Sequence, residues 1–281
     1  MHGAGFSTAS VCDVLEVCRS AYYAWRVGQP SGQEQRQTAL TPVIRAVFWK
    51  HRRRYGARRI AAELADLGEV CSPRFVAQIL RNQGLRAIQP RSFVPKTTNS
   101  QHLWGYSPNL ILDTPDPCGI DKLWVGDITY VPLRGGAFSY LASLMDRYSR
   151  NIVGWELAET MTDELTLAAL RMAIRDRQPS ALLVHHTDRG GQYASYRYRA
   201  VLRRAGMRQS MSRAGNVYDN AFMESCFGTF KTELEMTEYE NHRTARSKIA
   251  EYIDYYCTDR KHSALGYLTP SDFERASVWG S

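Results

Sequence analysis

The segment KLWVGDITYVPL, residues 122–133, combines aromatic and β-branched residues in the pattern of a β-strand and carries Asp127 in its middle. This pattern predicts a partly buried carboxylate. An ionised carboxylate within an apolar strand is costly unless a cation or hydrogen-bond donors meet it, and no Lys or Arg inside the strand is placed to do so. Asp127 therefore either pairs with a basic side chain from elsewhere or binds a metal ion.

A second aspartate ends another strongly apolar segment. Residues 181–187, ALLVHHT, predict a buried strand, and Asp188 follows directly, beside a Gly-Gly turn. This position places the carboxylate of Asp188 at the carboxyl end of a strand.

A helix that follows a glycine–asparagine turn supplies a third carboxylate. In residues 215–235, GNVYDNAFMESCFGTFKTELE, turn formers come first and apolar residues then recur at helical spacing. On such a helix Asn220, Glu224 and Lys231 fall near one face, because four residues are a little over one turn and seven are nearly two. A solvated surface residue is the commoner explanation for a single helical glutamate. Together with Asp127 and Asp188, however, Glu224 completes a set of hard oxygen ligands of the kind that Mg²⁺ or Mn²⁺ prefers.

Four motifs surround these residues and the end of the chain: WVGDITY at 124–130, HHTDRGGQY at 185–193, ESCFGTFK at 224–231 and RKHSALGYLTP at 260–270. The three carboxylates, with thirty-five residues between Asp188 and Glu224, resemble the DDE motif of retroviral integrases and bacterial transposases. The motifs are similar to those of the catalytic subunit of insertion-sequence transposases of the two-reading-frame class. The resemblance covers about residues 11–273. The chain departs from the family pattern at Gly126, Gly191 and Cys257, none of which is a carboxylate.

The resemblance implies an α/β fold with a ribonuclease-H-like catalytic core, in which a mixed five-stranded sheet has flanking helices. The residue pattern matches this order of elements: a turn at 134–136, strands at 138–145 and 151–157, a helix from 162–164, and then the strand that ends at Asp188. In such a core Asp127 and Asp188 lie on adjacent strands. We expect the core to span residues 120–240, and residues 241–281 to form a C-terminal helix and tail that pack on it.

The resemblance also implies a DNA transposase, which cuts a strand at the end of an insertion sequence and joins the freed 3′-hydroxyl to another phosphodiester. Asp127 would bridge two Mg²⁺ or Mn²⁺ ions, Asp188 and Glu224 would hold one each, and Lys231 would position a DNA phosphate. One alternative is a nuclease of the same fold that does not join strands. Another is a transposase-derived DNA-binding repressor, against which the intact carboxylates argue, because a costly buried Asp127 has no use without catalysis.

The basic excess of the chain lies entirely in its first hundred residues. The net charge is +8, and residues 1–100 hold 15 Lys and Arg against 6 Asp and Glu, whereas residues 101–281 are nearly neutral. Such an excess attracts a polyanion, although a solvated basic face on an ordinary domain gives the same composition.

Residues 38–88 have the pattern of a small all-α helix-turn-helix region. Thr41 and Pro42 predict the start of one helix, residues 58–67 a second, and Ser72 with Pro73 the start of a third. A helix pair with a polar outer side is the shape of a major-groove recognition unit, and a bundle with a solvated face is the alternative. The candidate DNA contacts are Arg58, Arg59, Arg74 and Arg81 in this region, and Asn220, Lys231, Arg260 and His262 in the core.

Three residues near the expected core have structural interpretations. Asp146 is expected to pair with Arg147 or Arg150, and His185 and His186 to form hydrogen bonds in the packed interior. The alternatives are that Asp146 supports a metal ligand and that one of the two histidines orients a water or a phosphate.

The remaining segments set the expected boundaries and cellular setting. Residues 1–37 predict an N-terminal helical segment, and residues 89–119 a proline-rich extended linker. The chain has no run of about twenty apolar residues, no signal-peptide pattern and no Cys-x-x-Cys pair among its six cysteines, so we expect a cytoplasmic protein with free thiols.

The family resemblance implies partners that composition does not show. It implies a bacterial, nucleoid-associated protein that acts on terminal inverted repeats and target DNA as a homo-oligomer on paired ends. It also implies fusion to, or partnership with, the product of an upstream reading frame, because the chain lacks a leucine-heptad segment.

Overall fold

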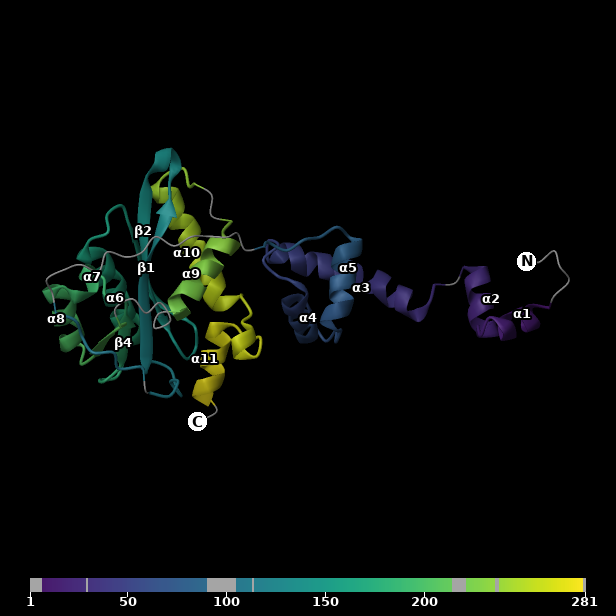
Figure 1. Cartoon of the computed structure of the whole chain (residues 1–281), viewed down its shortest axis with the longest axis horizontal. Helices are drawn as coiled ribbons and strands as arrows, with labels where there is room; N and C mark the ends of the chain where they lie inside the picture. The colour runs from purple at the N-terminus through teal and green to yellow at the C-terminus, as the bar shows by residue number, and fades with distance from the viewer. Residues whose placement is uncertain are drawn as a thin grey trace. The chain divides into compact units, whose positions relative to one another are not determined.

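The computed structural model describes residues 7–28, 30–89, 105–112, 114–213, 221–235 and 238–279. The chain divides into two compact units, Met1–Ala87 and Ile88–Ser281 (Figure 1). This division falls beside the expected end of the helix-turn-helix region. None of the described helices is both long and apolar enough to cross a membrane.

The first unit is helical throughout its described part. Its helices are α1 (Thr8–Val14), α2 (Arg19–Val27), α3 (Gly32–Lys50), α4 (Ala57–Asp66) and α5 (Pro73–Asn82). The Ser72 hydroxyl accepts a hydrogen bond from the Phe75 N–H, and Pro73 occupies the first turn, as the sequence predicts for α5. A core made by α3, α4 and α5 includes Ile44, Phe48, Ile60, Leu64 and Ile79.

The predicted start of α3 at Thr41 was wrong. The helix begins at Gly32, because Ser31 and Glu34 form a reciprocal capping box in which each side chain accepts a hydrogen bond from the other residue's backbone N–H. Pro42 lies inside this helix instead of opening it. The polar segment that precedes Thr41 is therefore helical from Gly32 onward.

The second unit contains one mixed five-stranded sheet in the order β3-β2-β1-β4-β5. The strands are β1 (Leu123–Pro132), β2 (Phe138–Asp146), β3 (Ile152–Ala158), β4 (Val184–Thr187) and β5 (Arg208–Met211). The first three form an antiparallel meander, with the short 3₁₀ turn η1 (Arg134–Gly136) between β1 and β2. In contrast, β4 pairs in parallel with β1, and β5 in parallel with β4. The sheet confirms the predicted fold class.

Helices cover both faces of this sheet (Figure 1). One face packs against α6 (Asp163–Arg177), α7 (Gly191–Ala194) and α8 (Tyr196–Arg204). The other packs against α9 (Ala221–Glu233) and α10 (His242–Thr258), and the chain continues through η3 (Ser263–Leu265) into α11 (Pro270–Trp279). Side chains alternate along β1, so Trp124 and Ile128 face α6–α8 whereas Val125 and Val131 face α9 and α10.

One glycine is required by the packing of α6 on the sheet. A Cβ atom at Gly154 of β3 would lie 2.4 Å from the Ala169 carbonyl oxygen and 2.8 Å from the Ala173 Cβ. The helix therefore approaches the strand more closely than any side chain would permit.

Candidate active site

Strand pairing brings Asp127 and Asp188 together. In the parallel β1–β4 pair Gly126 lies opposite Thr187, and the two aspartates are the next residues along their strands. Asp127 has the same side-chain direction as Val125, toward the face covered by α9. The two predicted carboxylates are therefore neighbours at the carboxyl end of β4, as the ribonuclease-H-like order implies.

The pKa of Asp127 shows how the other charged residues surround it. Burial raises this pKa well above its ordinary value, and the charge of Asp188 raises it further. The Ile128 N–H donates a hydrogen bond to Asp127 Oδ1 at 2.8 Å, and this bond lowers the pKa. Glu224 then adds to the increase, and Lys231 reduces it. The other two predicted carboxylates and the predicted lysine thus all act electrostatically on Asp127.

Glu224 and Lys231 both lie on α9, as predicted. Glu224 is exposed, and Lys231 is half-buried. Burial lowers the pKa of Lys231, and the charge of Asp127 partly restores it. Asn220, the third predicted residue of this face, lies outside the described residues.

Asp188 is fixed by the turn that follows it. The Gly190 N–H donates to Asp188 Oδ1 at 2.9 Å. A Cβ atom at Gly190 would lie 3.0 Å from that same oxygen, so glycine permits the close turn. Tyr193, one helical turn further, is buried, and its pKa is raised by burial and then by Tyr198, Asp127 and Asp188. Sequence reasoning did not identify this proximity of Tyr193 to both aspartates.

The donor set fits a divalent cation. Oxygen ligands suit Mg²⁺ and Mn²⁺, and three mutually repelling carboxylates create a local negative charge that a cation would offset. As they stand, no three His, Cys, Asp or Glu side chains in the described ranges are close enough to hold an ion.

The first turn of α9 is held by two arginines. The guanidinium carbons of Arg147 and Arg150 lie 4.1 and 4.2 Å from the Phe222 ring centroid. Both arginines come from the turn between β2 and β3. Because Phe222 is two residues before Glu224, these cation–π contacts position the start of the helix that carries the glutamate.

The last turn of α9 is held by a buried ion pair. Glu233 Oε1 accepts from Arg260 Nη2 at 2.7 Å, Oε2 accepts from Arg260 Nε at 2.9 Å, and the Tyr252 hydroxyl also donates to Oε2 at 2.9 Å. Both charged side chains are nearly inaccessible, at 7% and 5% exposure. Arg260 therefore joins the end of α9 to the chain that follows α10.

This burial corrects two of the expected DNA contacts. Arg260 is committed to Glu233, and His262 is buried, with its ring 4.7 Å from that of Tyr256. Neither side chain presents a donor on the surface in this structure. We therefore do not retain Arg260 and His262 as candidate DNA contacts.

The structural interpretations of the other polar residues hold, with one change of partner. His185 bonds the Tyr198 hydroxyl at 2.7 Å, and His186 bonds Ser210 and Ser212. Burial lowers the pKa of His185 to about 3, so it is neutral at pH 7. The carboxylate of Asp146 accepts from backbone N–H groups instead of from Arg147 or Arg150.

The departure from the family pattern at Gly126 has a steric explanation. A Cβ atom there would lie 2.9 Å from the His185 ring. Gly126 therefore makes room for the buried histidine beside the strand that carries Asp127.

The four basic candidates of the first unit lie on its surface. Arg58, Arg74 and Arg81 are exposed, and Arg81 Nη1 donates to Gln78 on the same helix. Arg59 is half-buried, because its guanidinium lies 5.7 Å from the Tyr55 ring centroid. The exposed arginines of α5 can reach a polyanion without rearrangement of the core.

Family comparisons agree with both units. Residues 120–217 match an integrase core domain, residues 205–270 match a second integrase core model, and residues 34–93 match an HTH-like domain. The chain thus combines a helical DNA-binding region with the catalytic core of a DDE polynucleotidyl transferase.

Curated relatives cover almost the whole chain. It is 42% identical to an insertion element IS600 31 kDa protein of Shigella sonnei, over 94% of this chain and 97% of that protein. It is 39% identical to the IS904 transposase of Lactococcus lactis, over 88% and 98%, and 37% identical to the transposase InsF for IS3A of Escherichia coli, over 99% and 97%. The chain belongs to the insertion-sequence transposases.

Among solved structures, similarity is found to retroviral integrases. A simian T-cell lymphotropic virus intasome in complex with a PP2A regulatory subunit is 14% identical, with a TM-score of 0.47 over 76% of this chain and 70% of that one. The HTLV-2 integrase catalytic core domain in complex with magnesium is also 14% identical, with a TM-score of 0.42 over 56% and 98%.

Proposed function

We propose that this DNA transposase cleaves and joins DNA strands at Asp127, Asp188 and Glu224. The observation that carries the proposal is the parallel pairing of β1 with β4, which places Asp127 beside Asp188 on the sheet face that α9 covers with Glu224 and Lys231. The charges of all three residues act on the pKa of Asp127. Carboxylates with a purely structural role rarely cluster unless groups of opposite charge are bound to them. In active sites, in contrast, carboxylates are clustered because the chemistry requires it.

The three carboxylates would hold two Mg²⁺ or Mn²⁺ ions, with Asp127 shared and Asp188 and Glu224 holding one each. When bound, such a pair neutralises charge on the attacking and leaving oxygens of an in-line displacement at phosphorus. The chain itself supplies the negative charge that selects for cations and, through β1 and β4, the fixed spacing between the aspartates.

Lys231 would bind the DNA phosphate next to the scissile bond. It is half-buried on the helix that carries Glu224, and its charge acts on Asp127. In the first step water attacks phosphorus and the 3′-oxygen leaves with a proton as a free hydroxyl. In the second step that hydroxyl attacks another phosphodiester and displaces its 3′-oxygen, so the number of phosphodiester bonds is conserved.

The N-terminal unit would bind the ends of the element. Exposed Arg58, Arg74 and Arg81, with Arg59, supply phosphate contacts from the HTH-like region, and Asn220 is a further candidate in the core. We propose that copies of the chain assemble on paired terminal inverted repeats in the bacterial cytoplasm at the nucleoid, and that an upstream-frame product assists them.

The test is a gel assay with labelled linear DNA that carries the element's ends, in Mg²⁺ or Mn²⁺. The wild-type chain is compared with Glu224→Gln and with Glu251→Gln, a control at an exposed acid of α10. We expect metal-dependent joined products from wild type and control and none from Glu224→Gln. Cleavage without joining would mean that the protein is a nuclease and does not transfer strands. Equal activity of Glu224→Gln and wild type would refute the proposed triad.

A further inference from the structure

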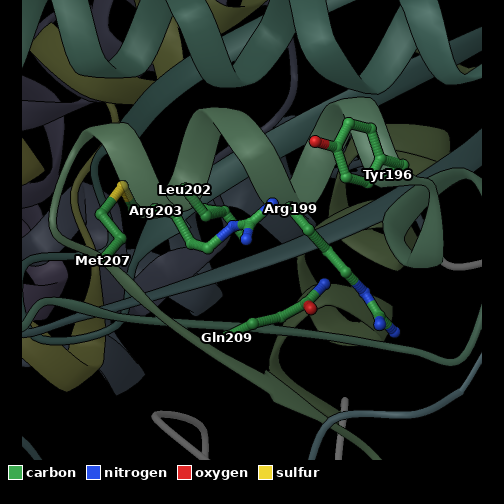
Figure 2. A pocket seen from close by; sticks show the side chains of 6 residues that line it. All are labelled: Tyr196, Arg199, Leu202, Arg203, Met207 and Gln209. Carbon is green, nitrogen blue, oxygen red and sulfur yellow. The ribbon is translucent and has the colours of Figure 1, made fainter.

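A cavity of about 420 Å³ lies between α8 and β5, on the sheet face opposite α9. Figure 2 shows the six side chains that line it: Tyr196, Arg199, Leu202, Arg203, Met207 and Gln209. The volume is in the range of small-molecule sites. Neither the proposed triad nor the HTH-like region accounts for this cavity.

The ionised side chains that line the cavity are all positively charged. Arg199 and Arg203 are its two ionised residues, and no acidic residue lies on α8. The neighbouring Arg197 is neutralised by Glu164 and Asp163 of α6, so its charge is already compensated. Among the described residues, neither Arg199 nor Arg203 forms an ion pair of this kind. An anion is therefore the complementary ligand.

Arg199 has a hydrogen-bond donor to spare. One of its terminal nitrogens donates to the Gly105 carbonyl, which fixes the side chain across the cavity. Its Nε is buried and finds no acceptor within the part of the chain that the structure describes. Because this Nε is inaccessible to solvent, it can meet a phosphate only after the Arg199 side chain moves, so the charge of Arg199 and not this donor favours an anion.

The rest of the lining suits the uncharged parts of a nucleotide. Tyr196 is 71% exposed, and the Arg203 guanidinium lies 5.7 Å from its ring centroid, at one side of the cavity. Leu202 and Met207 are buried and provide an apolar wall. An aromatic ring beside arginines is the arrangement with which proteins bind single nucleotides of a strand.

We propose that this cavity binds one nucleotide of a DNA strand, with its phosphate on Arg199 and Arg203 and its base on Tyr196. The bound strand is distinct from the one at Lys231, because α8 and α9 cover opposite faces of the sheet. Binding is independent of base sequence, because Gln209 already donates to the Tyr193 carbonyl and accepts from Ser107. A protein ligand fits less well, since it would have to supply both an acid and a flat ring.

The experiment measures binding of fluorescent oligothymidylate and of a random-sequence duplex to the full chain in EDTA, over a series of salt concentrations. EDTA separates this test from the catalytic proposal, which needs divalent ions. The variants are Arg199→Gln with Arg203→Gln, Tyr196→Ala, and the control Arg204→Gln, which removes an exposed arginine of the same helix outside the cavity.

The slope of the logarithm of the binding constant against the logarithm of salt concentration reports the number of phosphate contacts. We expect the double variant to reduce this slope by the equivalent of about one to two contacts, and Tyr196→Ala to weaken oligothymidylate binding about tenfold. Arg204→Gln should change neither value. Equal losses in all variants would mean diffuse attraction, and unchanged binding in the double variant would mean no site; either result overturns the proposal. So would altered self-association in sedimentation at unchanged DNA affinity.

A second measurement uses only the wild-type chain, in case the double variant does not fold. Arginine modification by phenylglyoxal, read by mass spectrometry, should be slowed at Arg199 and Arg203 by oligothymidylate and left unchanged at Arg171, an exposed arginine of α6. Equal protection of all three arginines would refute the site.

Discussion

Two aspartates of the same sheet, the half-buried Asp127 and the buried Asp146, are held in opposite ways. Asp146 is inaccessible, and its carboxylate accepts from the Asp121 N–H at 2.7 Å, the Ser149 N–H at 2.8 Å and the Ser149 hydroxyl. Asp127 accepts from the Ile128 N–H and faces two other carboxylates. Burial raises the pKa of both, but only Asp146 has a set of donors built into the fold.

The difference is the one that we expect between a structural carboxylate and a catalytic one. Glu233 belongs with Asp146, because Arg260 and Tyr252 satisfy it inside the protein. Glu63 in the first unit does too, because Lys50 and His51 approach its carboxylate at 2.7 and 3.5 Å. Asp127 instead has negatively charged neighbours, so a bound ligand has to offset the negative charge of its carboxylate.

The largest expected effect is that of Asp127→Asn. We expect strand-transfer activity to fall about 10³-fold, because the variant removes the carboxylate that we propose the metal ions share. The folded-state pKa of Asp127 is raised, so its ionised form costs stability at neutral pH, and the amide should leave the Tm in EDTA unchanged or higher. Activity assays and thermal unfolding measure the two quantities, and a lowered Tm would place Asp127 with the structural carboxylates.

Arg260→Gln should be the most damaging to stability. It leaves Glu233 buried without its cation, which typically costs about 3 to 5 kcal/mol. Denaturant unfolding measures this loss. The control is Arg243→Gln, which changes an exposed arginine at the start of α10. If both variants lost the same free energy of unfolding, Arg260 would not stabilise the buried Glu233.

Asp146→Asn should have the opposite profile to Asp127→Asn. An amide NH₂ placed against backbone N–H donors leaves one of them unsatisfied, at a cost of about 1 to 3 kcal/mol. Below the lowered melting temperature, strand transfer should stay within a few-fold of wild type. A loss of activity without a loss of stability would contradict the structural assignment of Asp146.

The smallest effect concerns Glu63 and pH. Contact with His51 chiefly lowers the pKa of Glu63 to about 2 from 4.5, with help from Lys50 and against burial. Its contribution is therefore present above pH 4.5 and is lost as pH falls toward 2, and Glu63→Gln should remove about 1 to 2 kcal/mol at neutral pH. Hydrogen exchange of the α4 amides across this range measures it, and identical acid profiles for variant and wild type would refute it.

Local patterns were sufficient to predict the strand that carries Asp127 and the helix that carries Glu224. Both have strong apolar periodicity, and the parallel neighbour of β1 followed from the family order. Strand β5 has no such pattern, because Arg-Gln-Ser-Met contains a single large apolar residue and is buried by its neighbours. Its residues could not be identified from the sequence.

The role of Arg260 could not be predicted for a different reason. In sequence it stands beside Lys261 and His262, which is typical of a basic surface tail, and its partner lies on another helix. A buried ion pair between distant segments leaves no local signal. The start of α3 did leave one, since Ser31 and Glu34 have the spacing of a capping box, and the presence of Pro42 obscured it.

The pairing of β1 with β4 makes the spacing of Asp127 and Asp188 independent of the length of the connection between them. Asp127 and Asp188 are separated by one interstrand distance, about 4.8 Å between strand axes, whatever the length of the connection that runs from β1 to β4. Residues can be inserted in the exposed segment before β4 without moving either carboxylate. A shift of β4 by a single residue, in contrast, would turn every side chain of the strand to the other face. The interval between the two aspartates can therefore change in length while this one strand pairing keeps the carboxylates adjacent.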